Sequence, residues 1–284
     1  MKALFLVLLF CLTGCAAPEP EPALEEEEAP LLVIDGRDLP AWRYLCWLDR
    51  CLAQGLDGEE AKAQALLDTA LYAAVESMAE EQGLALTEEE RSALVPGVWE
   101  EMPEEQWRAL SAVGALYGKL CAVEVPEETL KAFASEQGWR TVDRILIPAG
   151  EGAADKAAEV FARLNGGGEA AFQAEKAVSA DLEAPRTILP GQGLLDAALE
   201  AAAAELEEGQ LSGILESEEG FSILYCLPTD TSYIRIPWLD QQLRTRAEQA
   251  EIQALSGYET LDVSARKTLV LNENVQREAN ASSS

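Results

Sequence analysis

Cys15 is the residue whose surroundings most directly predict a chemical modification. It follows Leu12-Thr13-Gly14 at the end of an apolar run from Ala3 to Leu12, and Lys2 supplies a positive charge before that run. Residues 1–14 therefore have the layout of an export signal peptide, and about ten apolar residues are too few to cross a bilayer. The four residues ending at Cys15 match a lipobox, whose cysteine is acylated on sulfur. We expect a lipid anchor at Cys15; the alternative is an ordinary cleaved signal with a chance cysteine.

The cysteines beyond the signal do not form a zinc-binding pattern, and the chain has no histidine. Cys46 and Cys51 fall on different faces of a predicted helix, so we expect buried apolar thiols at these positions and at Cys121 and Cys226. A disulfide that involves Cys121 is the alternative. The lack of histidine excludes the hydrolase mechanisms that depend on it but leaves carboxylate or lysine mechanisms open. We expect no metal and no cofactor.

The charge of the chain restricts its partners. It contains 51 acidic and 21 basic residues, which give a formal net charge of -30 over 284 residues. Nucleic acid is excluded as a partner, because binding to it requires lysine and arginine to neutralise phosphates. The same charge opposes direct attraction to anionic lipid headgroups, so we expect a lipid at Cys15, and not the protein surface, to anchor the chain.

The segment after the signal predicts a spacer followed by a helical domain. Residues 15–30 combine prolines with like charges and predict an extended acidic spacer. A short strand over 31–34 then enters a turn at Asp35-Gly36, and residues 31–138 predict a mainly helical domain. The expected buried faces of its first two helices are Trp42, Leu45, Leu48 and Leu52, and then Leu67, Leu71, Val75 and Met78. Thr87 and Glu90 have capping-box spacing, Pro103 and Pro126 open two further helices, and we expect Trp107, Leu110, Tyr117, Leu120, Leu130 and Phe133 on their buried sides.

The pattern changes at Trp139. Residues 139–229 predict a strand over 141–147, helices over 153–164, 170–178 and 194–206, and strands over 211–215 and 221–227. This order is typical of a small sheet with helices packed on it, so the fold class is α+β. Residues 230–271 predict a C-terminal helix that packs back on the helical domain, with an extended piece at 268–271. Residues 272–284 predict a disordered tail.

Several weak motifs occur in an order that resembles a known family. These are Val33-Ile34-Asp35-Gly36 with Leu39-Pro40, the junction Gly83-Leu84-Ala85-Leu86-Thr87-Glu88-Glu89-Glu90, Val125-Pro126-Glu127-Glu128, Arg144-Ile145-Leu146-Ile147, Gly191-Gln192, Leu206-Glu207-Glu208-Gly209-Gln210-Leu211-Ser212 and Gly220-Phe221. The chain resembles the extracytoplasmic foldase lipoproteins of Gram-positive bacteria, which combine a SurA-like helical chaperone region with a parvulin-type peptidyl-prolyl isomerase domain. The resemblance implies an inserted parvulin-like domain over residues 139–229.

The resemblance also implies a site, and here the chain departs from the family. Members typically carry a histidine in the first strand and another in the last; the matching positions hold Arg144 and Ser222, whereas Asp181 matches a central acidic residue. Leu194 and Leu199 fall near the family's pocket-lining positions for proline. The alternative interpretation makes Arg144 an exposed strand residue and Asp181 a turn residue.

We therefore expect a membrane-anchored extracytoplasmic chaperone or foldase that assists the folding of exported polypeptides, with a parvulin-like domain of weak or lost isomerase activity. The helical domain and the C-terminal helix would form a cradle for unfolded segments. One alternative is an active isomerase that uses Asp181, Arg144 and Ser222. A further alternative is a solute-binding lipoprotein, which would require two α/β lobes with a cleft.

Overall fold

The computed structural model describes residues 29–268 and 270. The predicted signal peptide, Cys15, most of the acidic spacer and the C-terminal tail lie outside these residues. The predicted α+β class is confirmed, because helices of the described chain accompany two small antiparallel sheets. The chain divides into two compact units, one of residues 1–73, 96–109 and 247–284, the other of 74–95 and 110–246. The predicted domain boundaries stay predictions.

The first unit contains a three-stranded sheet with the order β2-β1-β7. Strand β1 (Pro30–Ile34) enters the predicted turn, whose two residues have positive φ, 49° at Asp35 and 76° at Gly36. Such a conformation suits a two-residue hairpin turn. The turn leads into strand β2 (Arg37–Pro40), which was not predicted and pairs with β1 as a hairpin. Strand β7 (Ile252–Ala254) pairs antiparallel with β1 and was not predicted, since three residues give no recognisable alternation.

Helix α2 (Ala41–Ala53) covers this sheet with the expected face, because Trp42, Leu45, Leu48 and Leu52 are all buried. The 3-10 helix η1 (Gly97–Trp99) and helix α11 (Ser256–Glu259) also belong to this unit. The expectation of an extended piece at 268–271 is wrong where the structure describes it, because Thr268 and Val270 are helical. In the same helical segment Arg266 Nε lies 2.5 Å from Asp49 Oδ1 of α2.

The buried face of helix α3 (Gly58–Glu81) differs from the one that the sequence predicted. Its most buried positions are Ala61, Ala65, Thr69, Ala70, Ala74, Val75 and Ala79. Of the four residues expected on the buried face, only Val75 is buried, whereas Leu67, Leu71 and Met78 are half-buried. Alanine side chains let neighbouring backbones approach closely, since interaxial distance depends on the side chains at the contact. A search for large apolar residues therefore selects the wrong side of such a helix.

The second unit holds the capping box as predicted. The Thr87 Oγ1 hydroxyl accepts the Glu90 N–H at 3.1 Å and Glu90 Oε2 accepts the Thr87 N–H at 2.7 Å, which starts helix α4 (Glu88–Ser92). Helices α5 (Glu104–Ala122) and α6 (Glu127–Gln137) directly follow Pro103 and Pro126. Of their expected buried residues, Leu110, Leu120 and Leu130 are buried, whereas Trp107, Tyr117 and Phe133 are half-buried.

Helix α10 (Arg235–Gln249) follows the 3-10 helix η2 (Thr231–Tyr233). Pro237 lies in the first turn of α10, where proline is tolerated. Within the second unit, α10 contacts earlier helices. Tyr117 of α5 donates a hydrogen bond of 2.7 Å to Asp240, and Arg246 pairs with Glu81 of α3 at 2.8 Å. Among the described residues no single helix is long and apolar enough to span a membrane; only α5 and α6 together, bent by 104°, meet the length and composition requirement.

The larger sheet of this unit has four antiparallel strands in the order β4-β3-β6-β5. Its centre is the long pair of β3 (Arg140–Pro148) and β6 (Gly220–Leu227), and its edges are β4 (Arg186–Ile188) and β5 (Leu215–Ser217). Strand β4 was not predicted. The strand expected over 211–215 is displaced, because Leu211 forms only an isolated bridge to Tyr225.

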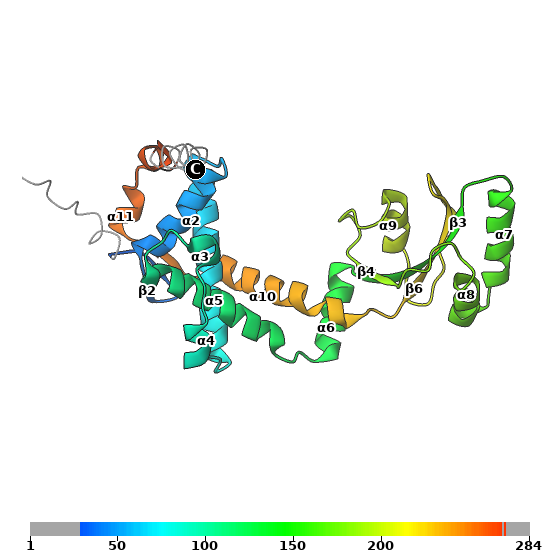
Figure 1. Ribbon diagram of the computed structural model, residues 1–284, viewed down its shortest axis with the longest axis horizontal. Coiled ribbons are helices and arrows are strands. Elements are labelled where there is room, and N and C mark those ends of the chain that lie inside the picture. The colour runs from blue at the N-terminus through cyan, green and yellow to red at the C-terminus, as the bar shows by residue number, and fades with distance from the viewer. Residues whose placement is uncertain (1–28, 269, 271–284) are drawn as a thin grey trace, which may run out of the picture. The chain divides into compact units, whose positions relative to one another are not determined.

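Helices cover the two faces of this sheet differently (Figure 1). Helices α7 (Ala153–Leu164) and α8 (Gly168–Lys176) pack on the face that carries Ile145, Ile147 and Ile223. Helix α9 (Ala197–Ala204) packs on part of the other face. The predicted bounds of α7 are confirmed, α8 begins two residues before its prediction, and α9 is shorter than expected because residues 190–196 form a loop.

Candidate functional site

A pocket of about 410 Å³ lies on the sheet face that α9 covers only in part. Strands β3 and β6, the loops before β4 and α9, and the β5–β6 turn supply its lining. Its apolar residues are Val142, Ala184, Leu194, Leu195, Leu199 and Leu224. Its polar and charged residues are Asp143, Arg144, Lys176, Asp181, Glu183, Arg186, Asp196, Ser217, Glu218 and Glu219. The volume is in the range of small-ligand pockets.

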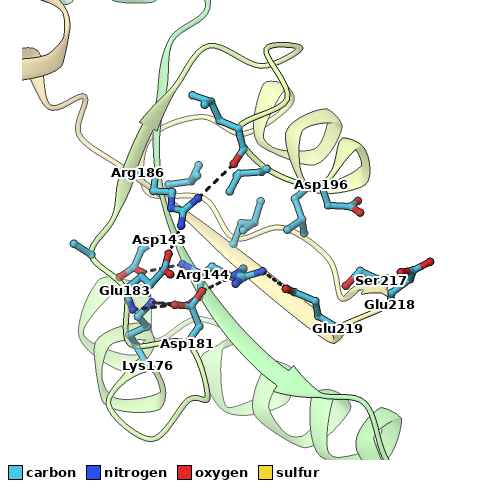
Figure 2. Close-up of a pocket in the computed structure, with 16 residues that line it drawn as sticks. Asp143, Arg144, Lys176, Asp181, Glu183, Arg186, Asp196, Ser217, Glu218 and Glu219 are labelled. Carbon is cyan, nitrogen blue, oxygen red and sulfur yellow. Dashed lines mark hydrogen bonds and ion pairs between the residues drawn. The ribbon is translucent and has the colours of Figure 1, made fainter.

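Arg144 is held in the pocket by two carboxylates (Figure 2). Its Nε lies 2.5 Å from Asp181 Oδ2 and its Nη1 lies 2.8 Å from Glu219 Oε2. Although burial opposes charge on the Arg144 guanidinium, the hydrogen bonds to both carboxylates raise its pKa. Burial likewise opposes charge on Asp181, but hydrogen bonds from Arg144 and from the Glu183 N–H lower the pKa of that carboxyl. Both groups are therefore charged at neutral pH.

Lys176 of α8 adds a second cation beneath this pair. Its Nζ lies 2.8 Å from Asp143 Oδ1 and 3.6 Å from Asp181 Oδ1, and it donates to the Arg144 carbonyl at 2.8 Å. Asp143 is 3% exposed and Lys176 is 8% exposed. Buried charges require such partners, because an unpaired one is too costly to remove from water. The four charged side chains form a continuous ion-pair network across one end of the pocket.

The structure brings most of the sequence-predicted site residues together. Arg144 and Asp181 are in direct contact, and neither side chain is exposed, so the alternative interpretation of Arg144 as an exposed strand residue is wrong. Leu199 is buried in the pocket wall, whereas Leu194 is 53% exposed at its edge. Ser222 is on the same sheet face, opposite Leu146, but its hydroxyl is fully buried outside the lining and has no hydrogen-bond partner among the described residues.

Glu200 was missed by the sequence analysis, although it shapes the pocket. Its carboxylate accepts the N–H groups of Leu195 at 3.0 Å, Gly191 at 2.6 Å and Gly193 at 3.2 Å. These backbone hydrogen bonds, that from Leu195 first, lower the pKa of Glu200. They fix the loop that carries Leu194. The sequence does contain a signal for Glu200: it is the one acidic residue of the alanine-rich helix α9, and it follows Gly191 and Gly193 by a few residues.

Lys176, Arg186 and Glu219 were also absent from the predicted site. Arg186 of β4 pairs with Glu183 and donates to the Leu194 carbonyl at 3.4 Å, so it connects the two loops that border the pocket. Across the part of the chain that the structure describes, no three histidine, cysteine or acidic side chains are grouped as metal ligands. The four thiols at Cys46, Cys51, Cys121 and Cys226 are free there, the first and third half-buried, the others buried.

No protein-family model matches the chain, and no curated protein matches it. Solved structures do. The foldase protein PrsA from Streptococcus pneumoniae is 16% identical, with 88% of this chain and 94% of that chain covered and a TM-score of 0.30. PrsA from Bacillus subtilis is 14% identical, with 88% and 93% covered and a TM-score of 0.29.

A third match comes from a study of PEB4 and Cj1289, described as SurA-like chaperones of Campylobacter jejuni. It is 10% identical, with 80% of this chain and 99% of that chain covered and a TM-score of 0.27. PrsA foldases and a SurA-like chaperone are thus among the solved structures to which this chain is similar, and they are of the kind that the sequence resemblance names.

Proposed function

We propose that this chain is a membrane-anchored extracytoplasmic chaperone or foldase that binds unfolded segments of exported polypeptides, and that its parvulin-like domain has weak or no isomerase activity. The observation that carries the proposal is the pocket on β3 and β6. Its three cations are paired with carboxylates of the same lining, while Leu194 of its apolar wall is open to a ligand.

The apolar wall supports peptide binding. Val142, Leu199 and Leu224 form the buried part of this wall, and Leu194 leaves half of its surface in water at the edge. The surface that a ligand would cover is that of Ala184, Leu194 and Leu195, because the other residues of the wall are already buried. Covering apolar surface is favourable by roughly 25 cal/mol per Å². An aliphatic side chain or a proline ring of a bound segment is therefore the ligand that this wall accepts.

The ion-pair network argues against efficient isomerisation. Rotation about a peptide bond has a barrier of roughly 18–20 kcal/mol, and catalysis requires polar groups aimed at the twisted amide. Here Arg144 already donates from Nε and Nη1 to carboxylates, Lys176 is paired with Asp143, and the Ser222 hydroxyl lies outside the lining. A peptide in the pocket would have to displace these partners first.

Exposed apolar residues outside the pocket also support a chaperone role. Tyr233 of η2 and Ile236 of α10 are 64% and 53% exposed. Single exposed apolar residues are ordinary, but neighbouring ones offer an additional contact for unfolded chains. The predicted cradle remains part of the proposal.

Two measurements on the purified mature chain test the proposed function. Proline isomerisation of a model peptide is followed beside the suppression of aggregation of a denatured client. We expect slowed aggregation and an isomerisation rate near the uncatalysed one. An isomerisation rate typical of parvulins would overturn the claim of lost activity, and undiminished aggregation would overturn the chaperone claim.

The anchor is tested separately on intact cells. Metabolic labelling with an alkyne fatty acid should label the wild-type chain and leave the Cys15→Ser variant unlabelled. Equal labelling of both chains would remove the proposed site at Cys15, and membrane fractionation of the two chains reports the localisation directly.

An active isomerase is the second candidate, favoured by the direct contact of Arg144 with Asp181 in the pocket. In that case Asp181→Ala abolishes a measurable rate. A solute-binding lipoprotein has less support, because the sheets formed by the described residues are a three-stranded and a four-stranded antiparallel sheet and not two parallel α/β lobes.

A further inference from the structure

We propose that the pocket selects cationic peptide segments, in which an apolar side chain is next to a lysine or arginine, and that Asp196 and Glu218 recognise the positive charge. This inference rests on the proposed peptide-binding function and adds a substrate class to it. The cavity and its apolar wall provide the binding site, and the charges of its lining provide the selectivity.

Every cation in the lining already has a carboxylate partner from the same lining. Arg144 pairs with Asp181 and Glu219. Lys176 pairs with Asp143 at 2.8 Å, and Arg186 pairs with Glu183. No cation of the described lining is therefore left to bind an acidic or phosphorylated segment.

Two carboxylates of the lining have no cationic partner among the described residues. Asp196 Oδ1 accepts the Ala198 N–H at 2.9 Å as the N-cap of α9, and Glu218 makes neither a hydrogen bond nor an ion pair within the part of the chain that the structure describes. Both residues are exposed. The lining thus holds six carboxylates against three cations, and the excess negative charge is at the edge of the pocket.

These two carboxylates lie on the same side of the pocket. In Figure 2, Asp196 at the start of α9 and Glu218 in the β5–β6 turn lie on the side opposite Lys176 and Glu183. Leu194 and Leu199 also line the pocket, and both are close to Asp196 in the sequence. A segment whose aliphatic side chain contacts these leucines would bring a neighbouring cationic side chain toward the unpaired carboxylates.

The expected selectivity is moderate and depends on salt. An exposed ion pair strengthens binding by up to about fivefold, so two carboxylates give a preference of roughly tenfold over a matched acidic peptide. The Debye length, beyond which exposed charges are largely screened from one another, is about 10 Å at 0.1 M salt and about 3 Å at 1 M salt. The preference should therefore decline as salt is raised, whereas the apolar contribution persists.

Fluorescence anisotropy on the full mature chain tests this proposal with three labelled peptides. The peptides share a central Leu-Pro and differ only in the next residue, which is Lys, Gln or Glu. We expect the affinity order Lys, Gln, Glu at low salt and convergence of the three values at 0.5 M NaCl. The double variant Asp196→Asn, Glu218→Gln should bind the Lys peptide several-fold more weakly and the Gln peptide unchanged.

The variants are chosen to leave the fold intact. Asparagine caps a helix about as well as aspartate. Glu216→Gln is the matched control, because this exposed residue is on the adjacent strand β5 and lines a different cavity. It removes one negative charge, as each of the two substitutions in the double variant does, and it should leave all three affinities unchanged.

The outcomes separate the proposals. Equal affinities of the wild type for the Lys and Glu peptides would overturn the charge selectivity while leaving the proposed peptide binding in place. A loss of preference in Glu216→Gln equal to that of the double variant would show that net charge, and not the pocket edge, is responsible. Failure of all three peptides to bind would overturn both proposals.

Discussion

The two faces of the β3–β6 strand pair are made from alternating residues of the same strands, yet they have different properties. One face is closed by α7 and α8, and its residues Ile145, Ile147 and Ile223 are at most 3% exposed. The other face is closed by α9 only near Val142, Leu224 and Cys226, and beyond them it holds the pocket and Arg144 with its partners Asp181 and Glu219. The comparison indicates that one face stabilises the domain, while the other holds the proposed binding site.

The largest effect should come from the closed face. Phe172 of α8 is fully buried, and its ring stacks on Tyr225 with centroids 5.2 Å apart. Phe172→Ala should lower the free energy of unfolding by about 3–5 kcal/mol, because it leaves a cavity in a packed core. Urea denaturation measures this loss. A loss below about 1 kcal/mol would contradict the view that this face stabilises the domain.

Asp181→Ala should have the next largest effect, since it leaves Arg144 without one of its carboxylates. We expect a loss of about 1.5–3 kcal/mol at neutral pH, as for a hydrogen bond to a charged group. Glu183→Ala is the control from the same loop, because Glu183 is exposed and its pair with Arg186 contributes at most about 1 kcal/mol. Equal losses in the two variants would contradict the importance of the buried network.

The contribution of Asp181 to the free energy of unfolding should decrease at low pH. Its partners hold the pKa of Asp181 below the ordinary value of 3.8 in the folded state. The stabilisation is therefore fully present above pH 3.8 and is lost as the pH falls through the folded pKa. The difference in unfolding free energy between the wild type and Asp181→Ala should decrease below pH 3.8. A difference that stays constant there would contradict the assignment.

Glu200→Gln should act locally on the open face. The neutral amide is a weaker acceptor for the N–H groups of Leu195, Gly191 and Gly193, so these three amides should exchange with solvent faster. Hydrogen exchange followed by mass spectrometry measures this change, and Glu205→Gln, at the exposed C-terminal end of α9, is the control. Unchanged exchange at the three amides would show that other contacts hold the loop.

Leu194→Ala should have the smallest effect on stability and a clear effect on binding. Leu194 is 53% exposed, so its truncation should change the unfolding free energy by no more than about 0.5 kcal/mol. Binding of a Leu-Pro peptide should weaken roughly threefold to tenfold, since apolar contact area in the pocket is lost. Val178→Ala, 80% exposed and outside the pocket lining, should change neither quantity. Unchanged binding in Leu194→Ala would place the peptide elsewhere.

Local patterns predicted the elements that local interactions determine. The apolar periodicity of α2, the bounds of the alanine-rich helix α7, the capping box at Thr87 and the turn at Asp35-Gly36 were all identified correctly. Strands β4 and β7 were missed because three residues carry no periodic signal and their partners are distant in sequence. The buried face of α3 was misplaced because alanine gives little hydrophobic contrast.

The candidate site was predictable only in part for the same reason. The resemblance selected Arg144, Asp181, Leu194 and Leu199, all of which line the pocket. It did not select Lys176 or Glu219, because their partners become neighbours only when a helix and a turn pack on the sheet. Glu200 was missed for another reason: its partners Gly191, Gly193 and Leu195 are close in the sequence, but only the folded loop turns their N–H groups toward its carboxylate. The buried position of Ser222 outside the lining likewise depends on packing above β6.

The pairing of β1 with β7 affects the timing of folding. Leu32 and Ile34 of β1 are 1% exposed in the finished sheet, and their register partners Ala254 and Ile252 are close to the end of the described chain. At 5–20 residues per second, roughly ten seconds or more of synthesis separate the appearance of the two strands. During that interval the newly made β1–β2 hairpin has an unpaired edge, which is a site for association with other chains. A protein whose proposed task is to protect unfinished chains thus passes through a similarly vulnerable stage during its own synthesis.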